Sequence, residues 1–515
     1  MTATIGGRRR HGIAIKYMAI LAVALFVSAG IAAIYTFSVP EPGTKTTAST
    51  STSMSTSIST SACAAPTPAI AMQLTPTTFG AISEYTLAAN RSPTGITVAP
   101  DGSVWFGEWG LPGVAHLLMN GTLTEYPWPY SYTTGSSFCG QKTEIWGVAM
   151  WNGSVWGADL LYSRLVGVNP STGQTQKINL VNDTEPYTLA VSPNNYLWFT
   201  ASKLGAQIGK VSPTNGTVTY YNLPTGKDWE AVYVLFQNDT VGYVLALDGL
   251  EYDNVQVLSF NPTLSNPTFT PIGDNQTLYA PTGLTLGEGG LWATEHSASA
   301  MAFLNFTTGA WTIYPTSTVP YTPWVLTYFD ASNGSAVWFN EHYGNRMGVI
   351  YDNATQLTEY NVSNPPLYNL TTITDPTNGT NMVTMAVAQD GAWFAAAGGF
   401  VGYVNGSYVP PFSISIDSSS VRVAPGGSAQ TMLRLTGDMV GSNLSLQFSD
   451  NEFNNGTAKL LSFTAAVPAT SVAGTGTASL SITAANGIQP GTYLAAATVT
   501  DGSIYRSVYF TVVVT

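Results

Sequence analysis

Charged side chains are scarce in this sequence. Asp, Glu, Lys and Arg make up 9% of its 515 residues, whereas they form about a quarter of an average soluble protein. Lysine and arginine total 17 against 29 acidic residues, which gives a net charge of −12. With so few basic residues there is no cationic face to neutralise phosphates, so we exclude a nucleic-acid partner. The hydrophobic fraction of 44% also excludes disorder, which combines low hydrophobicity with high charge.

Cysteine is nearly absent, since the sequence has two, Cys63 and Cys139. Two cysteines cannot by themselves make a metal site, whereas one disulfide is permitted outside the cell. We predict that Cys63 and Cys139 form a disulfide. Two free thiols are the alternative that the sequence leaves open.

Charge is missing altogether from a segment near the N-terminus. Met18–Phe37 is an apolar run of 20 residues, long enough to span a ~30 Å hydrocarbon core. Three arginines at 8–10 and Lys16 precede it, and the next basic residue is Lys45. The positive-inside rule therefore places the N-terminus in the cytoplasm and the rest of the chain outside.

These features predict a cytoplasmic tail at 1–16, one transmembrane helix at 17–39 and a body on the outer side of the cell membrane. A cleaved signal peptide is an alternative, although its apolar region is usually only about 7–15 residues long. Prepilin-type cleavage after Gly12 is a second alternative. In each case the body of the protein is exported.

Two further features agree with export. Residues 40–79 are predicted to form a flexible stalk, because 44–62 are almost entirely Ser and Thr and cannot bury a core. After the stalk come 16 Asn-x-Ser/Thr sequons without proline at x, among them Asn120, Asn152 and Asn215. Sequons mark acceptors of N-linked sugars, so we predict a glycoprotein.

One pattern recurs between residues 80 and 411. Its clearest copy is PTGITVAPDGSVWFGEW, then GVAHLL, then GTLTEYPWP, which reads as four short strands joined by Asp-Gly and Asn-Gly turns. The copies are anchored by Trp105, Trp156, Trp198, Trp292, Trp338 and Trp393. Their spacings are 51, 42, 94, 46 and 55 residues, and the spacing of 94 is a double period in which Leu245 replaces the tryptophan.

Seven four-stranded units of this length predict an all-β chain whose main domain, 80–411, is a seven-bladed β-propeller. Ser83–Leu87 matches the fourth-strand pattern but precedes the first full unit. We expect it to complete the last blade and close the ring. Residues 412–515 lack the tryptophan anchors and show short alternating runs between turns, which predicts an immunoglobulin-like β-sandwich.

The units PTGITVAPDGSVWFGEW…LTEYPWP and VWFNEHYGNRMGVI…LTEY resemble the repeats of the streptogramin B lyase (virginiamycin B lyase) family. The resemblance covers roughly residues 80–408 and implies a seven-bladed propeller. In that family it also implies a Mg-assisted elimination that opens a cyclic depsipeptide, with histidines in Pro-His-Gly elements of late blades and a glutamate in the last blade. Here the late Pro-x-Gly positions hold Thr282, Trp324 and Val383, and Phe-Ala-Ala-Ala follows Trp393. The base that an elimination needs is therefore missing from its expected place.

The ends of the second strands carry an unusual number of acidic residues. The position three residues after each anchor holds a carboxylate in five of the seven units, namely Glu108, Asp159, Asp248, Glu295 and Glu341. We expect these ends to face the central channel, where carboxylate oxygens could hold Mg²⁺ or Ca²⁺. The alternative is a structural role, in which each glutamate bonds to neighbouring backbone.

His296 and His342 follow two of these glutamates. Glu341 and His342 are the catalytic candidates, and a hydrogen-bonded structural pair is the simpler interpretation of each His. The position before the first strand is aromatic in four units, Trp146, Tyr187, Trp229 and Trp324. Aromatic faces there would bind sugar rings or apolar ligands.

Two functions of different kind follow from these observations. The first is a non-catalytic surface protein that binds a carbohydrate, a peptide or a cell-surface protein, or that delivers a ligand to a transporter. The second is an extracellular metal-dependent lyase or hydrolase. Propellers host both, so the fold alone does not choose between them.

Overall fold

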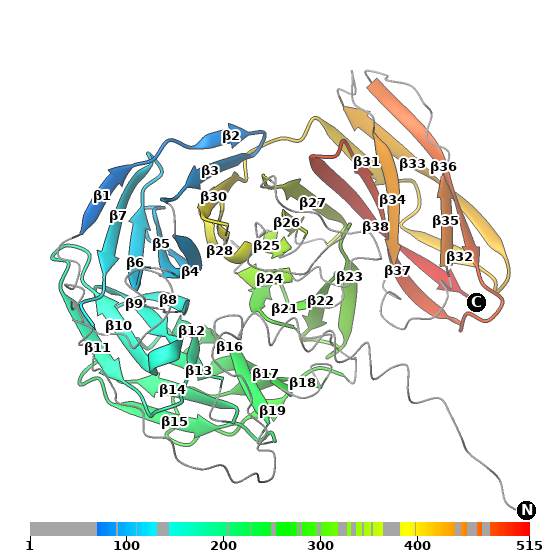
Figure 1. The fold of residues 1–515 in the computed structure, drawn as a ribbon. Helices are drawn as coiled ribbons and strands as arrows, with labels where there is room; N and C mark the ends of the chain where they lie inside the picture. The colour runs from blue at the N-terminus through cyan, green and yellow to red at the C-terminus, as the bar shows by residue number, and fades with distance from the viewer. Residues whose placement is uncertain are drawn as a thin grey trace, which may run out of the picture.

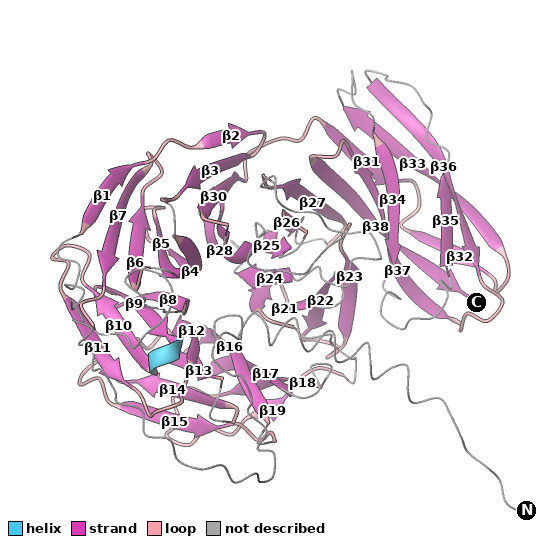
Figure 2. Cartoon of the chain, viewed as in Figure 1, coloured by secondary structure: helices cyan, strands magenta, loops and turns pink. Residues whose placement is uncertain are grey.

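The computed structural model describes residues 69–88, 91–109, 111–130, 144–202, 205–226, 228–248, 254–274, 278, 281–295, 300–317, 327–330, 336–341, 344–351, 354–363, 382–396, 398–437, 444–450, 461–465 and 474–515. Several predicted features lie outside these residues, namely the anchor, both cysteines, Trp324, His296 and His342. Within these ranges no helix is long and apolar enough to cross a membrane, and the helical element that appears in Figure 2 is a 3-10 turn, Leu160–Tyr162.

Seven sheets, each built on four antiparallel strands, stand around a common centre (Figure 1). We call them blades 1 to 7 and give their strands from the centre outward. Blade 1 is β4 Ser92–Val98, β5 Val104–Trp109, β6 Gly113–Leu117 and β7 Thr122–Pro127; blade 2 is β8 Ile145–Trp151, β9 Ser154–Asp159, β10 Arg164–Val168 and β11 Thr175–Asn179; blade 3 is β12 Pro186–Val191, β13 Leu197–Ala201, β14 Gln207–Val211 and β15 Val218–Asn222.

The remaining four blades repeat this plan. Blade 4 is β16 Trp229–Asn238, β17 Val241–Asp248, β18 Val255–Phe260 and β19 Thr270–Pro271; blade 5 is β20 Leu284–Gly287, β21 Gly290–Glu295, β22 Ala300–Asn305 and β23 Trp311–Pro315; blade 6 is β24 Thr327–Asp330, β25 Ala336–Glu341, β26 Arg346–Tyr351 and β27 Gln356–Asn361; blade 7 is β28 Met382–Ala388, β29 Gly391–Ala396, β30 Phe400–Asn405 and β3 Ile82–Thr86. The first strand of every blade contacts those of both neighbouring blades, from β4 round to β28 and back to β4. The ring is therefore closed.

Closure joins the two ends of the repeat region. β3 pairs antiparallel with β30, with Tyr85 opposite Val401, which confirms the prediction that this early segment completes the last blade. Two strands precede it: β2 (Thr77–Phe79) forms a hairpin with β3, and β1 (Ile70–Gln73) pairs with β7 at the outer edge of blade 1. The first strand among the described residues thus starts at Ile70, ahead of the predicted boundary at residue 80.

The repeated Trp-Phe pair explains why the blades stack. All six anchor tryptophans are at most 4% exposed, because they fill the space between neighbouring sheets. The phenylalanine beside the anchor lies over a glycine of the third strand: a Cβ on Gly209, Gly348 or Gly402 would overlap the ring of the phenylalanine in its own blade. These glycines are kept for close packing rather than for backbone freedom.

Threonine hydroxyls link neighbouring blades near the centre. Thr94 Oγ1 donates to the carbonyl of Ile145 at 2.7 Å, which joins blade 1 to blade 2. Thr384 Oγ1 donates to the carbonyl of Thr94, which joins blade 7 to blade 1. These bonds satisfy buried backbone carbonyls between neighbouring blades.

The C-terminal residues form two packed sheets. Their strands are β31 Phe412–Ile416, β32 Ser420–Val423, β33 Ser428–Gly437, β34 Ser445–Asp450, β35 Leu461–Ala465, β36 Gly474–Ala484, β37 Gly491–Thr500 and β38 Ile504–Val514. One sheet has the order β31-β33-β36-β35, and the other contains β34, β37 and β38, with β32 parallel to β38. Buried Leu433, Ile482 and Phe510 belong to the core that the two sheets share.

The second of these sheets is continuous with blade 6. β38 pairs antiparallel with β27, the outermost strand of that blade, from Gln356 opposite Val508 to Tyr360 opposite Ile504, and Figure 1 shows the two strands side by side. Tyr509 also donates to the carbonyl of Pro315 in blade 5 at 3.0 Å. The C-terminal sheets are therefore joined to the propeller through backbone hydrogen bonds, and not only by the connecting chain.

Candidate functional site

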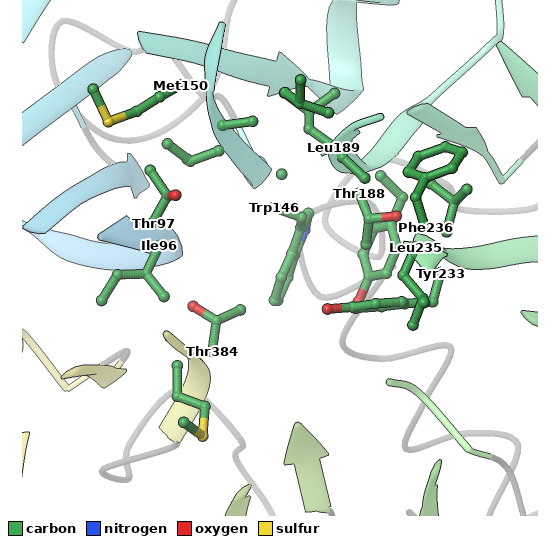
Figure 3. Close-up of a pocket in the computed structure, with 18 of the residues that line it drawn as sticks. Ile96, Thr97, Trp146, Met150, Thr188, Leu189, Tyr233, Leu235, Phe236 and Thr384 are labelled. Carbon is green, nitrogen blue, oxygen red and sulfur yellow. The ribbon is translucent and has the colours of Figure 1, made fainter. Parts of the chain in front are cut away.

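A cavity of about 450 Å³ lies at the centre of the ring (Figure 3). It is lined by the first strands of blades 1 to 4 and 7, together with Thr282 just before blade 5. In Figure 3, Trp146 stands between Ile96 and Thr97 of β4 on one side and Tyr233 of β16 on the other. None of the lining residues is charged.

β-Bulges direct the side chains at the start of the first strands. The register shifts between Pro93 and Ile96 in β4, between Ile145 and Val148 in β8, and between Pro186 and Leu189 in β12. A bulge adds a residue to one strand and turns its side chain. In blades 2 and 3 the bulges contain Trp146 and Tyr187, and both of these residues line the cavity.

The four aromatic residues predicted to bind ligand therefore fall into three groups. Trp146 and Tyr187 lie against each other in the cavity wall, with ring centroids 5.7 Å apart. Trp146 Nε1 donates to Glu144 Oε2 at 3.3 Å, which fixes the indole. Trp229 is not among the residues that line the cavity, and it packs in a core cluster with Trp198. Trp324 lies outside the described residues.

The strand register explains why Trp229 was misplaced. Trp146 and Tyr187 stand three residues before the partner of their anchor tryptophan, Ala149 and Ala190 respectively. In blade 4 the anchor is Leu245, and its partner is Tyr233. The equivalent position is therefore Glu230, one residue after Trp229. Trp146 and Tyr187 precede their anchors by 10 and 11 residues, whereas Glu230 precedes Leu245 by 15, so the spacing of the other blades could not have found it.

Sequence reasoning missed two cavity residues in the same strand, Tyr233 and Phe236. β16 has ten residues and carries two register shifts, between Ala231 and Tyr233 and between Phe236 and Asn238. Two extra residues change the alternation of faces twice, and a repeat pattern taken from other blades cannot show this.

The predicted carboxylates do not line the cavity. In blade 1, Glu108 is 1% exposed and lies 3.5 Å from Arg91 Nε. Arg91 itself makes a bidentate pair with Glu125 of β7, at 2.8 and 3.0 Å. Burial and the nearby Glu125 raise the pKa of Glu108 well above its usual range, and Arg91 lowers it by less.

Blade 6 repeats this arrangement with different connections. Glu341 is buried 3.9 Å from Arg346, and Glu359 occupies the position that Glu125 holds in blade 1. Burial, the charge of Glu341 and a hydrogen bond with it raise the pKa of Glu359 well above its usual range, because two close carboxylates favour sharing a proton. Arg346 donates to Ser317 and stacks on Tyr505 of β38, 3.6 Å from the ring centroid.

The other three carboxylates have different surroundings. Asp159 accepts from Arg164 at 2.8 Å, Asn254 lies 3.4 Å from Asp248, and Glu295 is fully buried. Among the described residues, no three His, Cys, Asp or Glu side chains are placed to hold a metal ion. In the described part of the chain these five carboxylates therefore do not come together in one cluster, and Asp159 is already paired with Arg164.

A different acidic pair lies near the starts of the first strands of blades 3 and 4. Glu230 follows Trp229 at the start of β16, and Glu185 stands two residues before Tyr187 in the neighbouring blade. Burial, reinforced by the charge of Glu185, raises the pKa of Glu230 to about 7. Glu230 is thus a carboxyl group that gains and loses its proton near neutral pH. This position had been assigned to Trp229.

The closed ring of seven four-stranded blades around a central cavity defines the class of protein, a seven-bladed β-propeller. Solved structures similar to this chain include virginiamycin B lyase from Staphylococcus aureus, with 20% identity, a TM-score of 0.50, and coverage of 63% of this chain and 98% of that one. A streptogramin B lyase is similar at 22% identity and the same TM-score, with coverage of 63% and 97%.

A catalytically inactive variant of the Staphylococcus aureus lyase, solved with quinupristin, gives the same values as the first match. No protein-family model and no curated protein matches the chain. At this level of identity the likeness establishes the propeller fold, and function has to be argued from the site.

Proposed function

We propose that this chain is a membrane-anchored, glycosylated ligand-binding protein of the cell surface, with a streptogramin lyase-like propeller and an immunoglobulin-like C-terminal domain. The observation that carries the binding role is the uncharged, aromatic-walled cavity. Its volume of about 450 Å³ is within the range of small-molecule sites. The ligand is therefore a small neutral molecule with an apolar or flat face, such as a sugar or a compact peptide.

The lining supports this ligand class in two ways. Trp146 and Tyr187 contribute aromatic rings to the wall, and Thr97, Thr282 and Thr384 also line it. The lining contains no charged residue that could pair with an ionic ligand. A charged group would have to leave water without a partner, which is costly.

Titration of the full-length chain in detergent tests the binding role, with isothermal calorimetry as readout and neutral oligosaccharides and short uncharged peptides as probes. We expect a saturable change for at least one probe. Trp146→Ala should abolish it, and Tyr187→Leu should weaken binding about tenfold, equivalent to ~1.4 kcal/mol. Tyr351→Leu is the matched control, because Tyr351 is 40% exposed on β26. A response unchanged in Trp146→Ala, or no response to any probe, contradicts the proposal.

One observation favours a second function, an extracellular lyase. Glu230, whose pKa is about 7, is suited to remove a proton near neutral pH. An elimination on a cyclic ester would break one C–O bond, form a C=C bond and leave the mass unchanged. Chromatography of a streptogramin B after incubation tests this: a new peak of the same mass that Glu230→Gln removes supports a lyase, and an intact antibiotic supports binding alone. Metal analysis of the purified chain tests the Mg²⁺ or Ca²⁺ requirement.

A further inference from the structure

Most sequons in the described part of the propeller lie at one end of the blades. Asparagines occupy the turn between first and second strands in blades 2 and 4, the turn between third and fourth strands in blades 1, 3 and 5, and the matching position after β30. In chain order these are Asn120, Asn152, Asn215, Asn238, Asn305 and Asn405. Because successive strands run antiparallel, these turns share one face of the ring, here called the turn face. Trp146 and Tyr187 begin their strands at the opposite face.

Five of these asparagines have the same local geometry. Their side-chain Oδ1 accepts the backbone N–H of the Ser or Thr two residues later. The distances are 3.0 Å at Asn120, 3.0 Å at Asn215, 2.9 Å at Asn238, 2.8 Å at Asn305 and 2.9 Å at Asn405. In this turn the oxygen is used internally, and within the described residues Nδ2 of these five makes no hydrogen bond. Four of the five are exposed, and Asn305 is half-buried.

The remaining sequons of the described propeller are obstructed. Asn361 donates through Nδ2 to the carbonyl of Gly502 at 2.5 Å and accepts from Arg346, so it is held between blade 6 and β38. Asn152 donates to the carbonyl of Pro213 at 3.2 Å. Asn182 is exposed, but the Thr184 that completes its sequon is fully buried.

We propose that Asn120, Asn215, Asn238, Asn305 and Asn405 carry N-linked sugars, and that these sugars cover the turn face of the described propeller. In the reaction, a transferase brings a sugar carried on a lipid-linked phosphate. The sugar C1 bonds to Asn Nδ2, the bond from C1 to the phosphate oxygen breaks, and the amide gives up one proton. The lipid phosphate is the leaving group.

Other turns in this chain have the same geometry but cannot accept a sugar. Asp101 and Asp501 make the identical bond to Ser103 and Ser503, at 3.0 and 2.8 Å, without an amide nitrogen. Asn169 and Asn261 make it too, but proline follows each of them and blocks the sequon. The turn therefore forms without a sequon, and folding alone does not require the Asn-x-Ser/Thr pattern at five positions.

Glycopeptide mass spectrometry of the full-length chain from its own exporting cells tests this inference. We expect sugar on most copies of the five asparagines, and on less than about a tenth of the copies of Asn152, Asn182 and Asn361. Asn215→Asp should remove one glycan and leave the melting temperature unchanged, because Asp keeps the turn. Asn215→Ala should remove the same glycan and also lower the melting temperature by a degree or two.

Bare asparagines at the five turns, or sugar mainly on Asn182 or Asn361, overturns the inference. It rests on the proposed location outside the cell, so protease treatment of intact cells is run on the same sample. A chain that protease reaches from outside but that carries no sugar at these turns contradicts this inference alone. A chain that protease cannot reach contradicts the proposed surface location as well.

Discussion

At the scale of single residues, two glutamates of one blade have different electrostatic environments. Glu125 is neutralised by the bidentate contact with Arg91, whereas the nearby Glu108 is buried with a raised pKa. A pattern of glutamates after a Trp-Phe pair predicts where the carboxylates lie along each strand. It cannot predict which of them an arginine from another loop will reach, because that depends on packing between distant segments.

Glu230 provides the clearest pH effect. Its pKa in the folded protein is about 7, raised from 4.5, so the folded state binds this proton more tightly than the unfolded state. The associated stability is fully present below about pH 4.5 and is lost as the pH rises through about 7. The shift corresponds to roughly 3 kcal/mol at most.

Glu230→Gln removes the charge and should therefore stabilise the protein at pH 8 but leave it almost unchanged at pH 4.5. Denaturant unfolding at the two pH values measures the difference. Asp239→Asn in the turn after β16 is the control, because that side chain is exposed. Equal effects of Glu230→Gln at both pH values would show that Glu230 titrates normally.

At the scale of elements, the local repeat determines most of what was predictable. The anchor tryptophans, the Asp-Gly and Asn-Gly turns and the closing strand β3 all followed from alternation and spacing, which depend on nearby residues. Blade 4 was predicted as a unit, but its register was not, since β16 carries two shifts. The pairing of β27 with β38 joins segments about 150 residues apart. Both segments have ordinary strand patterns, and the sequence of neither one indicates which strand it pairs with.

This β27–β38 junction should be important for stability. Tyr505 on β38 is 9% exposed and carries the Arg346 guanidinium on its ring. Tyr505→Ala should cost about 3 kcal/mol or more, from lost packing and the lost cation–π contact. Tyr505→Phe keeps the ring and should stay close to the wild type in thermal unfolding. A Tyr505→Ala chain as stable as the wild type would mean that the junction contributes little.

At the scale of the whole molecule, we expect the shared sheet to make the propeller and the C-terminal sheets unfold as one cooperative unit. Backbone bonds across β27 and β38 mean that neither part can unfold without exposing an edge of the other. Calorimetry of the full chain should therefore show a single main transition. Two well-separated transitions would indicate independent domains, as the sequence pattern by itself suggested.

The places where the chain ends attach also decide how the molecule would bear a mechanical load. Strand β1 pairs with blade 1 and β2 with blade 7, and β38 of the C-terminal sheets pairs with blade 6. Tension arriving along the predicted stalk would meet the exposed four-residue β1 first, and β1 would peel away before any blade opened. Trp146, Tyr187 and Tyr233 belong to blades 2 to 4, to which neither chain end is joined. In an optical trap, the first extension step should be the detachment of β1. Ligand should stay bound in the cavity after that step, because β1 detaches before the blades that line the cavity open.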